Sequence, residues 1–288
     1  MGVFKAAAIQ MRSGTSPERN AADMEQLVRE AVAMGASYVQ TPEMTGALVR
    51  DKDAKRTVFT SEDKDVVVAK ARQLARELGI HFHIGSTAIL RDDGKLANRA
   101  LLIAPDGTTL ASYDKIHMFD VDLDNGESWR ESAAYEPGTD AAVVDLAGLK
   151  LGFAICYDLR FPQLFRTEAL AGAAVLSVPA AFTRQTGEAH WHVLLRARAI
   201  ENGAFVIAAA QGGLHEDGRE TYGHSLIVDP WGRILAEAAH DEPSVIVAEI
   251  DPAQSVAARA KIPNLKNARE FSLRRFDGEP ASLRGAAS

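Results

Sequence analysis

Cysteine is nearly absent from this sequence of 288 residues, which contains only Cys156. A single cysteine cannot form a disulfide within the chain, and it cannot supply the paired CxxC spacing of structural zinc sites. This content is typical of a reducing compartment, and the apolar stretch near the amino terminus is too short for a secretory signal. We therefore expect a cytoplasmic protein.

Long apolar runs and an excess of basic residues are also missing. No apolar segment approaches the roughly 20 residues that a membrane-spanning helix needs. The formal net charge is −7, from 32 Lys and Arg against 39 Asp and Glu. Nucleic acids and membrane surfaces favour basic proteins. We therefore expect no nucleic-acid partner and no membrane partner.

Several common enzyme signatures do not occur. The sequence lacks the GxSxG motif of serine hydrolases, the HExxH motif of zinc hydrolases, and the glycine-rich fingerprints of nucleotide-binding loops. His81 and His83 alternate along an expected strand and share one face, but no third metal ligand lies near them in the sequence. We expect neither a metal nor a cofactor.

What remains is a regular alternation of strand and helix patterns, in a composition that is 47% hydrophobic. Helices are expected over 16–34, 61–78, from 162 onward, over 188–202 and over 251–262. Strands are expected over 4–10, 38–40, 81–85, 100–104, 110–113, 143–146, 149–155, 175–178, 205–210, 225–228, 234–236 and 245–250. No linker rich in Pro, Gly or Ser divides the chain, so we predict one α/β domain over 1–288, with a loosely held tail from about 277.

The stretch around Cys156 carries the strongest local signal. Leu149, Leu151 and Phe153 alternate as in a buried strand, and the cysteine follows at the strand's carboxyl end. Pro162 then marks the first turn of a helix. Ligands bind at the carboxyl edge of parallel strands, which makes Cys156 a candidate nucleophile. A free cysteine that only fills core space remains the alternative.

Two further polar residues follow expected strands in the same way. Glu43 lies just after the strand 38–40, and Lys115 follows the strand 110–113. Each of them alone fits a solvated surface side chain. The long polar loop 120–138, which contains Glu131, is of a length that is usually functional or disordered. Together, Glu43, Lys115 and Cys156 can converge at one edge of the sheets.

The motifs around these residues resemble those of the nitrilase superfamily of carbon–nitrogen hydrolases. They are TPEM at Glu43, YDKIHMFDVD at Lys115 and GFAICYDLRFPQLFR at Cys156, and RESAAYEPG resembles the segment with a second active-site glutamate, here Glu131. AFTRQTGEAHWHVLLRARAIEN and GRETYGHSLIVDPWG are similar to the Nit-type amidase branch. The resemblance implies an α-β-β-α sandwich that pairs into at least a homodimer.

The resemblance also implies a role for each matching residue. Cys156 is the expected nucleophile and forms a thioester with the substrate. Glu43 is the expected general base, and Lys115 with the backbone N–H of Tyr157 is expected to hold the oxyanion. Glu131 is expected to orient Lys115 or the substrate amide.

Substrate choice is expected to depend on Arg160, with Phe182 and Thr183 nearby in the substrate site. A guanidinium can hold a substrate carboxylate through two hydrogen bonds, whereas the alternative is that Asp158 or Glu168 neutralises Arg160. If Arg160 holds a substrate carboxylate in this way, the expected substrates are small carboxylate-bearing amides, such as α-ketoglutaramate or deaminated glutathione. N-carbamoyl amino acids, nitriles and a catalytically silent binding module remain alternatives.

Overall fold

Two six-stranded sheets form the centre of the computed structural model, which describes residues 2–122, 126, 128–146 and 148–275. The first sheet has the order β16-β1-β2-β3-β4-β5 and the second β15-β14-β11-β10-β9-β8. The first contains β1 (Phe4–Gln10), β2 (Tyr38–Gln40), β3 (His81–Leu90), β4 (Leu96–Ile103), β5 (Thr109–Asp114) and β16 (Ser244–Ile250). The second contains β8 (Val143–Leu146), β9 (Leu149–Phe153), β10 (Val175–Ser177), β11 (Phe205–Ala208), β14 (Leu226–Val228) and β15 (Ile234–Glu237).

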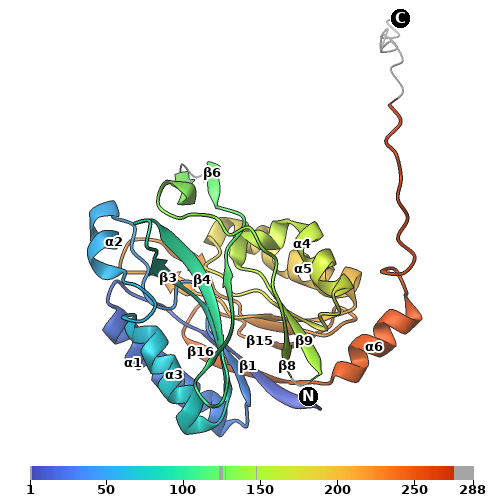
Figure 1. Cartoon of the computed structure of the whole chain (residues 1–288), viewed down its shortest axis with the longest axis horizontal. Helices are drawn as coiled ribbons and strands as arrows, with labels where there is room; N and C mark the ends of the chain where they lie inside the picture. Colours follow the sequence, from blue (N-terminus) through green and yellow to red (C-terminus); the bar gives the residue numbers. More distant parts are fainter. Residues whose placement is uncertain (1, 123–125, 127, 147, 276–288) are drawn as a thin grey trace, which may run out of the picture.

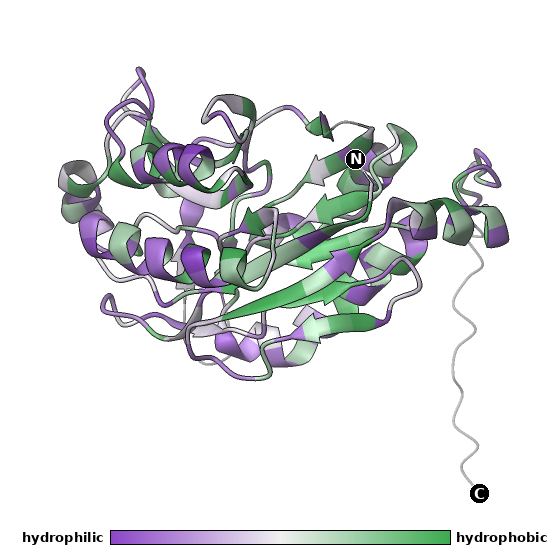
Figure 2. Cartoon of the chain, turned by 90° about the horizontal axis from the view of Figure 1, so that it is seen from below, coloured by the Kyte–Doolittle hydropathy of each residue, from purple (hydrophilic) through white to green (hydrophobic). Residues whose placement is uncertain are grey.

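Helices cover the outer face of each sheet (Figure 1). Helices α1 (Pro17–Ala33) and α3 (Val66–Leu78) lie on the first sheet, and α4 (Pro162–Leu170) and α5 (Arg184–Asn202) lie on the second. Helix α6 (Pro252–Lys261) follows β16. Figure 2 shows hydrophobic strands between these helices, whose polar residues face outward. The expected α-β-β-α sandwich is confirmed.

Strand β1 shows why the sheets bury both faces. Ala6 and Ala8 belong to the core between the sheets, whereas Ala7 and Ile9 pack in the core under α1 and α3. All four are fully buried. Successive side chains of a strand point to opposite faces, so the middle of a strand with helices on one side and a sheet on the other is apolar on both faces. The polar residues of β1, Lys5 and Gln10, lie near its two ends.

Two predicted helices begin at different residues in the structure. The helix expected from 61 begins at Val66, because Asp65 accepts the N–H groups of Val67 and Val68 at 2.8 and 2.9 Å and so caps the helix there. The helix expected from 188 begins four residues earlier, at Arg184, with Thr183 at its cap position.

Other elements were missed at the sequence level. Helix α2 (Lys52–Val58) was not predicted. The expected long loop contains a hairpin of β6 (Asp120–Asp122) and β7 (Ser128–Arg130), and a second small hairpin joins β12 (Gly212–Leu214) and β13 (Glu220–Tyr222). The tail expected from about 277 lies outside the described residues. Among the residues that the structure describes, no helix has the length and apolar character needed to cross a membrane.

Candidate active site

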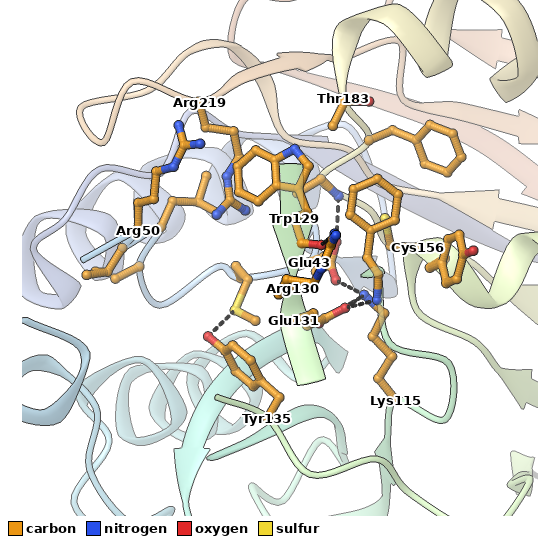
Figure 3. Close-up of a pocket in the computed structure, with 18 of the residues that line it drawn as sticks. Glu43, Arg50, Lys115, Trp129, Arg130, Glu131, Tyr135, Cys156, Thr183 and Arg219 are labelled. Atoms are coloured by element: carbon orange, nitrogen blue, oxygen red, sulfur yellow. Dashed lines mark hydrogen bonds and ion pairs between the residues drawn. The ribbon is translucent and has the colours of Figure 1, made fainter. Parts of the chain in front are cut away.

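Residues from four separated segments meet in one cavity of about 210 Å³ (Figure 3). Glu43 follows β2, Lys115 follows β5 and Cys156 follows β9. Glu131 begins the short 3₁₀ helix η1 (Glu131–Ala133), directly after β7. The structure therefore brings together the four side chains that were predicted to be catalytic, and all four line the cavity.

Cys156 occupies a sharp turn between β9 and the 3₁₀ helix η2 (Cys156–Arg160). Its φ of 49° is in the left-handed region, which costs a non-glycine residue of order 1 kcal/mol or more and is tolerated only where neighbours fix the backbone. The Cys156 N–H donates to the carbonyl of Pro179 at 2.9 Å. Buried Asp158 accepts the N–H of Ile155 at 2.9 Å and the hydroxyl of Tyr113 at 2.8 Å. These bonds hold the thiol at the cavity wall.

The Lys115 ammonium group lies between two carboxylates. Its Nζ donates to Glu43 Oε1 at 2.9 Å and to Glu131 Oε1 and Oε2 at 3.1 and 2.8 Å. Lys115 is only 2% exposed, so the interpretation of it as a solvated lysine is wrong. A buried ammonium group with three hydrogen-bond acceptors around it has a fixed position and charge.

Asn98 is a residue of this site that the sequence analysis missed. Its side-chain Nδ2 donates to Glu43 Oε1 at 2.9 Å and to Glu131 Oε1 at 3.1 Å. Its backbone carbonyl accepts the backbone N–H of Lys115 at 2.9 Å. Its signal in the sequence was a single amide residue within β4, a strand of mostly apolar residues. The Asn98 side chain is fully buried. Asn98 therefore bridges the two glutamates.

The loop that carries Glu43 is fixed from several directions. Glu43 Oε2 accepts the Ala181 N–H at 2.8 Å, and the Glu43 carbonyl accepts from Gln211 Nε2 at 3.1 Å. At Gly85, a Cβ atom would collide with the carbonyl oxygen of Thr41. The lack of a side chain on β3 lets the Glu43 loop pass close over the strand.

Charge and burial set the protonation states in the cavity. Burial acts to raise the pKa of Glu43, but the charge and hydrogen bond of Lys115 outweigh it and lower that pKa. Burial and the negative charge of Glu43 raise the pKa of the Cys156 thiol well above its usual range. Burial acts against the charged form of Lys115, yet Glu131 and Glu43 raise its pKa well above its usual range. At neutral pH the cavity thus holds a neutral thiol beside an ionised carboxylate and an ammonium group.

This arrangement can move a proton and stabilise a developing negative charge. Glu43 is within hydrogen-bonding reach of the Cys156 thiol, so it can accept the thiol proton. The Lys115 ammonium group faces the same cavity and can stabilise an oxyanion there.

The other predicted substrate-site residues separate into two groups. Tyr157, Phe182 and Thr183 line the cavity together with Thr186, whose Oγ1 lies 2.8 Å from Thr183 Oγ1. Arg160 is not one of the lining residues.

Arg160 packs against two aromatic residues of the cavity wall, Phe182 and Tyr157. Its guanidinium carbon lies 5.2 Å from the ring centre of Phe182 and 5.9 Å from that of Tyr157, and its Nη1 lies 3.2 Å from His190 Nδ1.

The expected alternative, in which Asp158 or Glu168 neutralises Arg160, is wrong. Asp158 bonds to Tyr113, Ile155 and His117, whereas Glu168 accepts the Phe153 N–H at 3.0 Å. Burial raises the pKa of Glu168 well above its usual range, which favours its neutral form.

Four cationic side chains of the cavity wall, besides Lys115, were not predicted, and an indole ring lies among them. They are Arg50, Lys55, Arg130 and Arg219, and the indole belongs to Trp129. Arg130 is paired with Asp122 at 2.8 Å. All of these residues except Lys55 lie on loops or small hairpins, where no periodic pattern marks a buried face.

The described residues outside this cavity contain one cluster that could hold a metal ion. His192, His224 and Glu237 place their ligand atoms within 4.8 Å of one another. Glu237 Oε1 is already hydrogen bonded to both imidazoles, at 2.8 and 3.1 Å. His81 and His83 do not form such a cluster, because His83 is fully buried between the sheets and its Nδ1 shares a hydrogen bond of 2.7 Å with the Tyr38 hydroxyl.

Comparison with known proteins identifies the family. Residues 5–260 match the family model of the carbon–nitrogen hydrolases. A deaminated glutathione amidase from Synechocystis sp. is 41% identical over 275 residues, which cover 93% of this chain and 98% of that protein.

Solved structures agree with this assignment. The NitFhit protein of C. elegans superposes with a TM-score of 0.87 at 34% identity, over 93% of this chain and 66% of the C. elegans chain. An amidase variant from Nesterenkonia sp. AN1, with the acetamide moiety of fluoroacetamide bound covalently at its active-site cysteine, superposes with a TM-score of 0.76 at 27% identity, over 90% of this chain and 95% of that chain. The resemblance seen in the motifs is confirmed: the chain belongs to the carbon–nitrogen hydrolase family and is an amide-hydrolysing enzyme.

Proposed function

We propose that this enzyme hydrolyses small carboxylate-bearing amides, such as the ω-amide of a 2-oxo acid or deaminated glutathione, through a thioester on Cys156. The observation that carries the proposal is the buried set of Glu43, Lys115 and Cys156 around one cavity. The name of the Synechocystis relative supports the substrate class, and the covalent adduct in the Nesterenkonia amidase supports attack by the cysteine.

In the first half of the proposed reaction, Glu43 takes the Cys156 proton while the sulfur attacks the amide carbon. The carbonyl oxygen becomes an oxyanion, which Lys115 and the backbone N–H of Tyr157 stabilise. Glu43 then gives its proton to the nitrogen, the carbon–nitrogen bond breaks, and ammonia or an amine departs. The acyl group remains on the sulfur as a thioester.

In the second half, Glu43 removes a proton from a water molecule while the oxygen of that water attacks the thioester carbon. The carbon–sulfur bond breaks, the carboxylic acid is released, and the thiolate recovers the proton from Glu43. The raised pKa of the Cys156 thiol agrees with a mechanism in which base and nucleophile act together, rather than with a preformed thiolate.

Glu131 and Asn98 have positioning roles in this scheme. Glu131 accepts hydrogen bonds from Lys115 Nζ and also accepts the Phe119 N–H at 2.7 Å. Asn98 fixes the positions of the two carboxylates relative to each other by donating to both. Their effect is to aim the Lys115 ammonium group at the position of the oxyanion.

We assign to Arg160 the binding of the carboxylate on the acyl part of the substrate. Arg160 does not line the cavity, but its guanidinium carbon lies 5.2 Å from the ring centre of Phe182, which does, so the cation is one side chain away from the substrate site. Because Arg160 has no carboxylate partner within 4 Å among the described residues, its charge is available to a substrate.

We also propose that the enzyme is a cytoplasmic homodimer. The single buried cysteine is consistent with a reducing compartment. Apolar side chains on the outer faces of the helices support pairing, since Leu170, Val193, Ile200 and Val256 are each more than half exposed. Light scattering of the purified protein tests this, and a Val193→Glu variant that stays a dimer would place the interface elsewhere.

The decisive experiment measures product release from a panel of carboxylated amides, N-carbamoyl amino acids and nitriles, together with intact-mass spectrometry after rapid quench. We expect turnover of the amides and an acyl adduct on the wild-type chain. Cys156→Ala should form no adduct and lose turnover while keeping its fold. Undiminished turnover in Cys156→Ala, or turnover confined to nitriles or carbamoyl compounds, would overturn the proposal.

A further inference from the structure

Three side chains away from the active-site cavity converge on one carboxylate oxygen. His192 Nε2 lies 2.8 Å from Glu237 Oε1, and His224 Nδ1 lies 3.1 Å from the same oxygen. His192 belongs to α5, His224 to the loop between β13 and β14, and Glu237 is the last residue of β15. Glu237 is 45 positions from His192 and 13 from His224, a spacing that matches no linear metal-binding motif. We call these three residues the His–His–Glu cluster.

The surrounding structure fixes the two imidazoles before any ion binds. His224 has a φ of 54°, in the left-handed region that a non-glycine residue adopts only where neighbours fix the backbone. Its carbonyl accepts Nε1 of Trp191 at 2.8 Å, and Trp191 directly precedes His192 on α5. The Tyr222 ring stacks on the His224 ring, with centres 4.2 Å apart and planes inclined by 19°. The loop and the helix that carry the two histidines are thus joined directly.

The separations in the His–His–Glu cluster are close to those of a zinc site. Zinc binds imidazole nitrogen and carboxylate oxygen at about 2.0–2.2 Å, which places neighbouring ligand atoms of a tetrahedral site about 3.3 Å apart. The three ligand atoms here already lie within 4.8 Å of one another. The two hydrogen-bonded separations need to lengthen by about half an ångström or less to admit the ion. Small side-chain rotations are enough for this change.

Protonation in the His–His–Glu cluster favours exchange for a cation. Burial acts to raise the pKa of Glu237, but the hydrogen bonds of His192 and His224 lower it. An ionised carboxylate only accepts hydrogen bonds, so both imidazoles donate an N–H to it. A divalent ion takes the place of these two hydrogens, and each imidazole then carries its proton on its other ring nitrogen. The carboxylate supplies negative charge to the ion.

A cavity of about 330 Å³ beside His224 gives an ion and a water molecule access to the cluster. Glu188 and Asp241 are among its lining residues, and so is Arg184. The Arg184 guanidinium is paired with Glu188 at 3.5 Å and with Asp241 at 3.2 Å. Its positive charge is therefore compensated locally and opposes an entering cation only weakly.

We propose that His192, His224 and Glu237 bind a divalent transition-metal ion of the zinc type, with a water molecule as the fourth ligand. Two imidazoles and one carboxylate select Zn²⁺ or Co²⁺ over Mg²⁺ and Ca²⁺, which prefer oxygen ligands. The ion joins α5 to β14 and β15 and stabilises this side of the second sheet. None of the three residues lines the active-site cavity, so the inference is independent of the proposed amidase function.

Calorimetric titration with Zn²⁺ tests the site in tag-free Cys156→Ala protein that has been freed of metal by a chelator. This background removes the active-site thiol, which is itself a zinc ligand. We expect one Zn²⁺ per chain and no binding of Mg²⁺. Glu237→Gln keeps a hydrogen-bond acceptor but loses the carboxylate, and it should weaken Zn²⁺ binding at least about a hundredfold, the upper end of what changes outside the ligand shell cost. His192→Gln should do the same.

The matched control is His81→Gln, which removes a half-buried histidine of β3 in the other sheet and should bind Zn²⁺ like the parent protein. Equal Zn²⁺ affinity in the control and in the two cluster variants would overturn the site, because the ion would then bind elsewhere. The melting temperature of the wild type should rise with Zn²⁺ concentration, whereas that of Glu237→Gln should not.

Co²⁺ distinguishes a metal site from a cluster that only forms hydrogen bonds. Its visible absorption depends on the number and geometry of its ligands, so wild-type protein should show the intense bands of four-coordinate Co²⁺, and Zn²⁺ should remove them. Wild-type protein without these bands would overturn the proposal. If the cluster variants do not fold, crystals of the wild type grown with Zn²⁺ decide. An anomalous-difference peak between the three side chains supports the site, and its absence there refutes it.

Discussion

Lys115 Nζ lies 2.9 Å from Glu43 Oε1, although the two residues are 72 positions apart in the chain. Both are almost fully buried, and Lys115 meets Glu131 at 2.8 Å on its other side. Removing charges from water costs several kcal/mol per ion, and only close partners offset that cost. The three buried charges therefore depend on one another, and two of them, Lys115 and Glu43, act directly in the proposed reaction.

We predict that Lys115→Ala lowers both activity and stability. Losing an oxyanion donor reduces kcat roughly 100- to 1,000-fold. Removing the ammonium group also leaves Glu43 and Glu131 buried without their counterion, which should reduce the free energy of unfolding by about 3–5 kcal/mol. Ammonia release and urea denaturation measure the two effects.

The pH dependence of the stability loss in Lys115→Ala tests whether the unpaired carboxylates cause it. Without Lys115, burial raises the pKa of Glu43 in the folded state above its unfolded value, so the folded variant gains stability from proton binding at low pH and loses it as pH rises. The stability deficit should thus be larger at pH 7 than at pH 4.5. A deficit that is the same at both pH values, or a kcat loss below about tenfold, would contradict a buried catalytic ion pair.

Asn98→Leu should reduce kcat through the position and pKa of Glu43. Burial acts to raise that pKa, and the Asn98 hydrogen bond is one of the interactions that lower it after Lys115 and Cys156. A hydrogen bond to a charged group contributes about 1.5–3 kcal/mol, so we expect a loss of about ten- to a hundredfold. The acid limb of the pH–rate profile should move to higher pH.

The pH profile distinguishes positioning from a general structural effect. Asn98→Gln keeps the amide and should recover part of the activity and part of the acid-limb position. A reduced rate with an unshifted acid limb in Asn98→Leu would show that Asn98 only fills space in β4.

Arg160→Lys should weaken kcat/KM for α-ketoglutaramate, because an ammonium group cannot reproduce two parallel N–H donors. The loss should be about ten- to a hundredfold and much smaller for the same amide with its carboxylate esterified. Steady-state kinetics on the two compounds measures the difference. Similar losses on both would show that Arg160 acts only by packing on Phe182 and Tyr157.

The order of the main elements could be predicted because β1 and β9 carry apolar residues at alternate positions, because β11 is apolar throughout, and because caps such as Ser16 mark the helices. Helix α2 could not be predicted, since its sequence is mostly charged and only Asp51 marks where it begins. The sequence analysis predicted that the strand beginning at His81 ends at Gly85. In the structure an irregularity in register between Ile84 and Thr87 lets β3 continue to Leu90.

The site divides in a similar way. Glu43, Lys115 and Cys156 could be predicted because each lies within three residues of the end of a strand and in a motif that resembles those of the family. The burial of Lys115 could not, since a lysine at a strand end has the same local pattern whether it is solvated or paired. Asn98 was missed because its partner Glu43 is 55 positions away. The arginines on loops were missed because only the fold places them beside Trp129.

His83 should make the protein less stable in mild acid. It is fully buried between the sheets, and burial lowers its pKa to about 3. An unfolded chain would protonate this histidine near pH 6.5. Between these two values the unfolded state binds one more proton than the folded state, so the free energy of unfolding falls by about 1.4 kcal/mol for each pH unit of acidification.

The contribution of His83 is isolated by comparing variants, because other groups also titrate in this range. His83→Gln removes the titrating group, so its free energy of unfolding should fall less steeply between pH 6 and 4 than that of the wild type. Urea denaturation at half-unit pH steps gives the two slopes. Parallel slopes for wild type and His83→Gln would mean that His83 takes up its proton in the folded protein, against its position between Tyr38 and Phe153.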